Sequence, residues 1–491
     1  MSLKNFFFRI GMVLFLTTIC QAGAAKRPNI LFLLTDDQRF DTIGALGNDR
    51  IKTPNLDRLV EEGIVFENAY IMGGNSMAVC TPSRAALFSG RTLWNLESQG
   101  VWDFAISSRH PTFAEVLREG GYLTFATGKN DPGFGKNDHF ARSFVEGDAL
   151  YYRGGHRGQN RTPLFGYPGE GPGGRGERIK SGETFNADLF ADACVEFLRG
   201  RKGREEPFLA YVPFMTPHDP LNAPEEFLKQ YHGEGMKLPA DFLPEHPFDA
   251  GVHAIRDEKL MKRPLESDRL KSRLAKYYAL MTHTDAQIGR ILSALDESGH
   301  ADNTVVIFSS DNGLALGSHG LTGKQNVYEH SVKVPLVIRG PGMGRGEKRS
   351  QLCYLYDLYP TMCELAGVAT PPTVEFQSLL SVIREAGAQH RETLFFSFMH
   401  CQRAVRNGPY KLLEFCVEGK RTTRLFDLGE DPFETRDLSG REEMQAVLTR
   451  MRRLLEKEAK HLNDGNSEAP HLREMSETFW KTYRAQAGRS E

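Results

Sequence analysis

Residues 29–37 read Asn-Ile-Leu-Phe-Leu-Leu-Thr-Asp-Asp, an apolar run that ends in two carboxylates. The run has no polar alternation, which is typical of a strand buried on both faces of a parallel sheet. Three other runs have the same form and also pass into polar residues: Tyr122–Gly128 before Lys129, Phe208–Thr216 before Pro217-His218, and Thr304–Ser310 before Asp311-Asn312. The four runs predict the central strands of one sheet.

Helix-like patterns separate these runs, and each of them ends at glycine: residues 53–63, 112–121 and 273–299. Alternating strands and helices predict an α/β layer fold. In such folds the ligand site lies beyond the carboxyl ends of the strands. The polar residues that follow the four runs all fall there, so we expect them to form one shared site.

The pattern changes near Thr393, where short hairpin-like strands begin and a helix follows near Glu442–Lys460. We predict a catalytic domain over residues 25–390 and a smaller C-terminal α+β domain over residues 391–491, an antiparallel sheet with one helix. Asn407-Gly408 is a two-residue hairpin turn signal. It would place Cys401 opposite Glu414, so a Cys401–Cys416 disulfide is possible but not favoured. Residues 154–176 and 231–263 are expected to be long surface loops.

The N-terminus has the features of a secretory signal peptide over residues 1–24. A basic start is followed by an apolar stretch, Ile10–Ile19, and by the small residues Ala22-Gly23-Ala24. We therefore expect a periplasmic or secreted protein, with lipid anchoring through Cys20 as the alternative. No later segment is long and apolar enough to cross a bilayer.

The composition is that of an ordinary globular protein, with 491 residues, 40% hydrophobic and 25% charged. The formal net charge of −2 argues against a nucleic-acid-binding protein. Apart from Cys20 and Cys80, five cysteines remain. An odd number of this size does not indicate a disulfide scaffold.

Four polar side chains at strand ends form a candidate metal site: Asp36, Asp37, Asp311 and Asn312. Three carboxylates converging with one amide would repel one another without a cation, and oxygen ligands select a hard ion, Ca²⁺ or Mg²⁺. Taken singly, Asp-Asp could cap a helix and Asp-Asn-Gly could form a turn. Their joint position after two strands favours the metal.

Cys80 is the candidate nucleophile. Pro82 fits the first turn of a helix that continues through Phe88. A nucleophile at a helix N-terminus meets the positive end of the helix dipole, which favours an anionic ester. An unmodified Cys80 would be a reactive thiol or a buried residue.

The sequence resembles the type I sulfatase family of the alkaline-phosphatase superfamily, over Arg27 to about Leu438. Four segments carry the resemblance: Cys80-Thr81-Pro82-Ser83-Arg84 (C-x-P-S-R), Gly121–Lys129 (G-Y-x-T…G-K), Pro217–Pro220 (P-H-x-P), and Gly323–Glu329 (G-K-x-x-x-Y-E). The sequence of residues 36–48 is similar to the corresponding segment of secreted bacterial sulfatases that act on carbohydrates. The resemblance implies a large mixed, mostly parallel sheet sandwiched by helices (alkaline-phosphatase-like), with the smaller C-terminal α+β domain.

The resemblance also implies a role for each candidate residue. Cys80 would be oxidised to formylglycine (3-oxoalanine), whose hydrate attacks sulfur and which joins the four polar residues around Ca²⁺ or Mg²⁺. Arg84 would hold the hydrate, Lys129 and Lys324 would bind sulfate oxygens, and His218 would protonate the leaving alcohol. The implied partners are a sulfated carbohydrate and a formylglycine-generating or anaerobic sulfatase-maturating enzyme.

One departure from the family pattern follows Lys129, where most relatives carry a histidine two or three residues on. This chain has Asn130-Asp131-Pro132. Asp131 could act as the base, His139 could substitute, or turnover could be impaired. Two other functions therefore stay open: a phosphate or phosphonate monoester hydrolase, and a catalytically impaired protein that binds sulfated glycans. His319, near Lys324, fits a site role and a structural role equally well.

Overall fold

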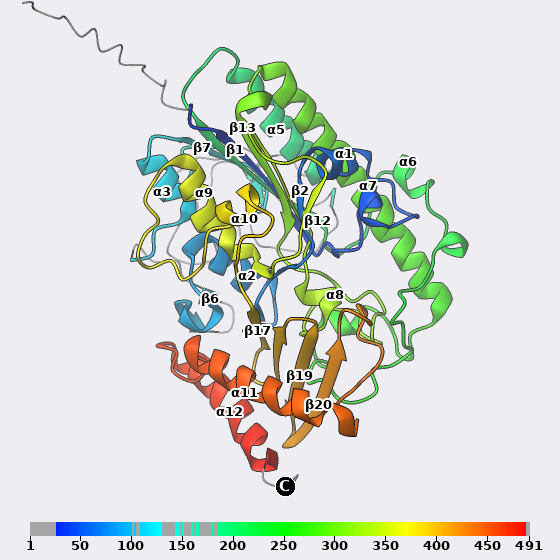
Figure 1. The fold of residues 1–491 in the computed structure, drawn as a ribbon. Helices are drawn as coiled ribbons and strands as arrows, with labels where there is room; N and C mark the ends of the chain where they lie inside the picture. The colour runs from blue at the N-terminus through cyan, green and yellow to red at the C-terminus, as the bar shows by residue number, and fades with distance from the viewer. Residues whose placement is uncertain are drawn as a thin grey trace, which may run out of the picture.

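The computed structural model describes residues 26–100, 103–104, 109–129, 143–147, 150–151, 159–160, 164–165, 178–179 and 184–487 (Figure 1). The predicted signal peptide, Cys20, Asp131 and His139 lie outside the described residues. So does most of the predicted loop over residues 154–176. None of the helices in the described part of the chain has the length and hydropathy of a membrane span.

The centre of the molecule is an eight-stranded sheet in the order β15-β2-β14-β13-β1-β12-β7-β8. Its middle consists of the four strands that the sequence predicts: β1 (Asn29–Asp36), β7 (Leu123–Ala126), β12 (Phe208–Pro217) and β13 (Thr304–Ser310). These four pair in parallel, whereas β14 (Leu336–Arg339) runs antiparallel to β13. The predicted mixed, mostly parallel sheet is confirmed.

Helices cover both faces of this sheet (Figure 1). Alternate residues of β1 explain why: Ile30 and Phe32 pack into one apolar cluster, while Leu31 packs into another. One cluster includes residues of α2 (Cys80–Ser89), α3 (Phe113–Glu119) and α9 (Leu358–Ala366). The other includes residues of α1 (Pro54–Glu62), α5 (Asn186–Gly200) and α7 (Ser267–Ser298). The uninterrupted apolar run Ile30–Leu34 of β1 is therefore buried on both faces, and the predicted α/β layers are confirmed.

A second, five-stranded sheet lies toward the C-terminus in the order β20-β19-β18-β17-β4. It contains β17 (Thr393–Phe398), β18 (Gln402–Asn407), β19 (Tyr410–Val417) and β20 (Lys420–Asp427), which pair antiparallel. The fifth strand, β4 (Gly73–Gly74), comes from far upstream and pairs in parallel with β17. The domain division at residues 390 and 391 stays a prediction.

The predicted single C-terminal helix is wrong, because two helices follow the small sheet (Figure 1). α11 (Gln445–His461) corresponds to the predicted one, and α12 (Pro470–Ala487) comes after it. In α12 the side chains of Leu472, Phe479 and Tyr483 are buried in the larger apolar cluster. An amphipathic face therefore stabilises this second helix, with proline at its first position.

The predicted hairpin register is also wrong. Asn407 pairs with Tyr410, so the turn residues are Gly408-Pro409 rather than Asn407-Gly408. This register places Cys401 opposite Cys416, whose backbone N–H donates to the Cys401 carbonyl oxygen at 2.8 Å. Both cysteines are buried and carry free thiols.

The remaining elements are short. The strands are β2 (Ile64–Phe66), β3 (Ala69–Tyr70), β5 (Ser98–Gly100), β6 (Asp103–Phe104), β8 (Glu146–Gly147), β9 (Leu150–Tyr151), β10 (Leu164–Phe165), β11 (Arg178–Ile179), β15 (Glu347–Arg349) and β16 (Cys353–Tyr354). The helices are α6 (Glu225–Leu228), α8 (Glu329–Val332) and α10 (Leu380–Arg384).

Candidate active site

Asp36 and Asp311 lie side by side because their strands are parallel neighbours. Thr35 of β1 is in register with Ser310 of β13, so the two aspartates mark adjacent strand ends. The Asp311 backbone N–H donates to the Thr35 carbonyl oxygen at 3.1 Å. The backbone N–H of Asp37 donates to Asp311 Oδ1 at 3.3 Å. The sheet itself therefore brings the predicted carboxylates together.

Asp37 leaves the strand in a left-handed conformation, with φ 67°. Successive strand residues point to opposite faces, and this turn lets Asp37 join the same site as Asp36. The Tyr277 hydroxyl on α7 fixes the turn by donating to the Asp37 carbonyl oxygen at 2.7 Å. It also accepts the Arg39 backbone N–H at 3.0 Å. An aspartate is one of the residues that tolerates positive φ.

The helix α2 begins at Cys80, which is 5% exposed. Two residues of the same segment anchor the helix to the strand end. Ser83 Oγ donates to the Asp311 carbonyl oxygen at 2.7 Å, and Arg84 Nε donates to Asp311 Oδ2 at 2.7 Å. Ligand atoms of Cys80, Asp36 and Asp311 lie within 4.8 Å of one another. The candidate nucleophile is thus adjacent to two candidate metal ligands.

Lys129 reaches the site from the end of β7. Its backbone N–H donates to the Pro213 carbonyl oxygen at 2.7 Å, and its Nζ lies 2.6 Å from Asp36 Oδ2. The preceding Gly128 has φ 125°, and a Cβ there would lie 2.1 Å from the same Pro213 oxygen. Only glycine allows this close crossing of β12, so Gly128 sets the position of Lys129.

Three side chains converge on the Asp37 carboxylate. Lys324 Nζ lies 2.5 Å from Oδ1, and Asn312 Nδ2 donates to the same oxygen at 2.7 Å. His218 Nε2 lies 3.7 Å from Oδ2, and the His218 Nδ1 lies 2.7 Å from the Asp219 carbonyl oxygen. If Nδ1 carries the proton that this oxygen accepts, Nε2 is the nitrogen that faces the site.

Two oxygen atoms at the centre of this arrangement fit a metal ion. Asp36 Oδ1 and Asn312 Oδ1 are buried and have no hydrogen-bond partner among the residues that the structure describes. Such atoms are rare in folded proteins. A hard cation would satisfy both, and with Asp37 and Asp311 it would have the oxygen ligands that Ca²⁺ and Mg²⁺ prefer.

Comparison with known proteins agrees with this geometry. Residues 28–368 match the family described as Sulfatase, and residues 317–461 match the family described as N-sulphoglucosamine sulphohydrolase, C-terminal. The chain belongs to the sulfatase family. It is a sulfuric ester hydrolase.

Two relatives of this sulfatase each match 91% of its length. An arylsulfatase of Clostridium perfringens is 28% identical over 91% of this chain and 97% of its own length. An N-acetylglucosamine-6-O-sulfatase of Bacteroides thetaiotaomicron is 25% identical over 91% of this chain and 88% of its own length. A solved structure described as a complex with its substrate D-glucosamine-2-N,6-O-disulfate has a TM-score of 0.74, at 23% identity, over 90% of this chain and 99% of the other. That likeness shows the fold.

The buried charges of the sulfatase site shift the pKa values of its carboxyl groups in different directions. Burial raises the pKa of Asp36, but Lys129, His218 and Lys324 outweigh it and hold that pKa well below its usual range. Burial and the neighbouring Asp36 raise the pKa of Asp311 to about 6. Burial works against the charge of Lys324, yet the pKa of its ammonium lies well above the usual value because Asp37 lies beside it.

The predicted surface loop over residues 231–263 supplies support for Lys324 that the sequence analysis missed. Gln325 Nε2 donates to Asp257 Oδ2 at 2.7 Å, and the Gly323 N–H donates to Glu258 Oε1 at 2.8 Å. Asp257 and Glu258 are both buried. The adjacent acidic pair was visible in the sequence, but its contact with a segment more than sixty residues away was not.

Proposed function

We propose that this sulfatase releases inorganic sulfate from a sulfated carbohydrate, with residue 80 acting as formylglycine beside Ca²⁺ or Mg²⁺. The observation that carries the proposal is the convergence of Cys80, Asp36 and Asp311 at the start of α2. The carbohydrate is supported by relatives, among them the N-acetylglucosamine-6-O-sulfatase.

Two groups complete the site. Formylglycine at residue 80 would supply the attacking oxygen through its hydrate, and Asp36, Asp37, Asp311 and Asn312 would hold a divalent ion that would neutralise charge on the sulfate. A metal fits Asp36 Oδ1 and Asn312 Oδ1, which find no hydrogen-bond partner in the described part of the chain. Arg84 donates a hydrogen bond from its Nε to Asp311, and this contact fixes the position of the Asp311 carboxylate.

Lys129 and Lys324 bind the sulfate oxygens. Each ammonium has three N–H donors, and each already places one carboxylate within 2.6 Å. Both ammonium groups thus lie beside the strand ends, where a tetrahedral anion would bind. Fixed cations in a buried site stabilise the charge that develops on the transferring oxygens.

His218 protonates the leaving sugar oxygen. Its ring is fixed by the contact between Nδ1 and the Asp219 carbonyl oxygen, so Nε2 points into the site toward Asp37. A protonated Nε2 donates its hydrogen to the ester oxygen as the bond to sulfur breaks. Asp131 is the proposed base for release of sulfate, in place of the histidine that most relatives carry.

The predicted signal peptide and the burial of Cys80 support a proposal for where and when the protein matures. We propose export to the periplasm or the exterior, directed by residues 1–24. Cys80 is 5% exposed beneath the strand ends. A formylglycine-generating or anaerobic sulfatase-maturating enzyme must therefore reach Cys80 before α2 packs against the sheet.

The test combines peptide mass with substrate preference. The protein is produced in its native host or with a maturation enzyme, and the peptide containing residue 80 is analysed by mass spectrometry for formylglycine. Sulfate release is then measured on sulfated mono- and disaccharides, including N-acetylglucosamine 6-sulfate, and 4-nitrophenyl sulfate is compared with 4-nitrophenyl phosphate. We expect the aldehyde form, sulfate release from at least one sugar, and a preference for sulfate.

Three results would contradict the proposal. An unmodified thiol at residue 80 with no sulfate release would favour a glycan-binding protein. Faster turnover of the phosphate ester would favour a phosphate or phosphonate monoester hydrolase. Full activity in a Cys80→Ala variant would exclude the nucleophile.

A further inference from the structure

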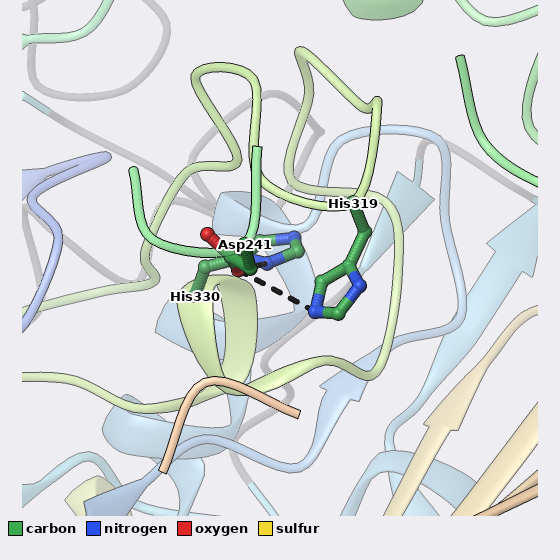
Figure 2. Close-up of side chains that lie close together, drawn as sticks. All are labelled: Asp241, His319 and His330. Carbon is green, nitrogen blue, oxygen red and sulfur yellow. Dashed lines mark ion pairs between the residues drawn. The ribbon is translucent and has the colours of Figure 1, made fainter. Parts of the chain in front are cut away.

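Three metal-ligating side chains converge outside the sulfatase site: Asp241, His319 and His330 (Figure 2). One ligand atom of each lies within 4.8 Å of the other two, and all three residues are buried. Asp241 lies in the segment between α6 and α7, His319 lies in the turn before Lys324, and His330 lies on α8. Figure 2 shows both imidazole rings turned toward the Asp241 carboxylate.

Two distances in this cluster are longer than an ordinary hydrogen bond, and the shorter of them matches the separation of two ligands of one ion. Asp241 Oδ2 lies 3.4 Å from His319 Nε2 and 3.8 Å from His330 Nδ1. An N–H···O hydrogen bond spans roughly 2.7–3.2 Å. Two atoms bound tetrahedrally to one zinc ion, each about 2.0–2.1 Å from it, are about 3.3–3.4 Å apart.

His330 adds a second, independent observation. Its side chain is 2% exposed, and neither ring nitrogen makes a hydrogen bond to any residue that the structure describes. A buried polar atom without a partner is uncommon and calls for an explanation. An ion bound to Nδ1 satisfies one of the two nitrogens.

The surrounding chain holds the other two ligands in place. Ser318 Oγ donates to Asp241 Oδ1 at 2.8 Å, which leaves Oδ2 for the ion. The His319 backbone N–H donates to the Asp241 carbonyl oxygen at 2.7 Å, and its ring stacks on Tyr328 with centroids 4.1 Å apart. His319 has φ 51°, a strained conformation of the kind that persists at functional sites.

One hydrogen-bond contact of His319 competes with metal binding, and experiment must distinguish the two. His319 Nε2 also lies 3.2 Å from the Phe433 carbonyl oxygen. In a metal-free protein, Nε2 would carry a hydrogen and donate it to that oxygen. With an ion bound, Nε2 would be a ligand, and the Phe433 oxygen or a water would complete the coordination.

We propose that Asp241, His319 and His330 form a second metal site, for a transition metal such as Zn²⁺. Two imidazoles and one carboxylate suit Zn²⁺, whereas the all-oxygen set of the sulfatase site suits Ca²⁺ or Mg²⁺. The site connects the segment around Asp241, the turn before Lys324 and α8. Its role is to stabilise the backbone that carries Lys324.

The test measures metal binding, and its outcome is independent of sulfatase activity. The full chain carries Cys80→Ser so that this thiol cannot bind metal, and it is stripped with chelator before titration with Co²⁺ and Zn²⁺. The parent should bind one equivalent of Co²⁺ with a visible tetrahedral ligand-field band. His330→Gln should weaken this binding at least about 10-fold, the lower range seen even for loss of an outer-shell partner.

His246→Gln is the matched control, because His246 is a buried neighbour whose Nε2 lies 3.2 Å from the Tyr328 hydroxyl and which is not a proposed ligand. It should bind Co²⁺ like the parent. Asp241→Asn keeps the shape of the side chain, serves if His330→Gln does not fold, and should also weaken binding. The proposal is wrong if the parent binds no Co²⁺ or Zn²⁺ stoichiometrically, or if both ligand variants bind it as tightly as the parent.

Discussion

A Gly128→Ala substitution tests whether the end of β7 sets the position of Lys129. An alanine Cβ would lie 2.1 Å from the Pro213 carbonyl oxygen, whereas real Cβ atoms essentially never come closer than 3.0 Å to such an atom. The chain must therefore move apart by at least 3.0 − 2.1 = 0.9 Å at this point. Lys129 is the next residue, and its own N–H donates to the same oxygen, so its ammonium moves with the backbone.

The expected effects follow from this displacement. A misplacement of about 1 Å in an active site can lower the rate about 100-fold. We therefore expect kcat/KM for 4-nitrophenyl sulfate to fall by about that factor. A non-glycine residue at φ 125° adds strain of roughly 1–3 kcal/mol, which lowers the free energy of unfolding measured in urea.

Gly47→Ala separates the strain from the displacement. Gly47 also has positive φ, 106°, but nothing lies within 4 Å of the Cβ that alanine would add. This variant should lose comparable stability and keep its activity close to that of the wild type. Should Gly128→Ala fold and show the same kcat/KM as Gly47→Ala, the claim that Gly128 positions Lys129 would be refuted.

Four other predictions follow from contacts described here or from neighbouring buried charges. His218→Asn should lower kcat about 10²–10⁴-fold on a sugar sulfate and less on 4-nitrophenyl sulfate, whose leaving group needs little protonation; equal losses on both would exclude the proton-donor role. Asp464→Ala should lower the free energy of unfolding measured in urea by about 3–5 kcal/mol, because it removes the carboxylate that pairs at 2.6 Å with Arg403, whose side chain is 0% exposed. An Arg403→Met/Asp464→Leu double variant should recover much of this loss. Burial, with Glu329 nearby, raises the pKa of Glu434 to about 7, so protonated Glu434 contributes fully to stability below about pH 4.5 and this contribution is lost as the pH rises through about 7. The free energy of unfolding should therefore fall between pH 5 and pH 8, and Glu434→Gln should reduce this pH dependence. Chelator treatment should abolish sulfate release and added Ca²⁺ or Mg²⁺ should restore it, whereas full activity without metal would contradict the proposed ion.

The central sheet could be predicted because burial on both faces leaves a direct mark on the sequence. β1, β12 and β13 each contain an uninterrupted apolar run. The polar residue that enters the site is the last residue of β1 and the residue that directly follows β12 and β13. The hairpin register was harder, since two adjacent pairs, Asn407-Gly408 and Gly408-Pro409, could both form the turn. A shift of one turn residue moves the partner of Cys401 by two positions, from Glu414 to Cys416.

The candidate site was predictable as a set of residues but not as a set of contacts. Strand ends indicate that Asp36, Asp37 and Lys129 converge, and the family resemblance adds Lys324. Nothing in the sequence, however, pairs Lys129 with Asp36 rather than with Asp37. That pairing depends on the left-handed turn at Asp37 and on the crossing at Gly128. The second cluster shows the same limit, because His330 carries no spacing signal that relates it to Asp241.

The charges of the sulfatase site connect metal binding to anion binding. Among the residues that the structure describes, three buried carboxylates (Asp36, Asp37 and Asp311) pair with three cations (Lys129, Lys324 and Arg84), so these six side chains together offer an anion little net attraction. A divalent ion bound among the carboxylates would make the site positive and would weaken the attraction of the aspartates for the two lysines. Their N–H donors would then be able to bind the sulfate ester. Each ligand would favour the state that binds the other, because such coupling is reciprocal. On this proposal, metal and ester bind together from the ion-paired form seen in the chain.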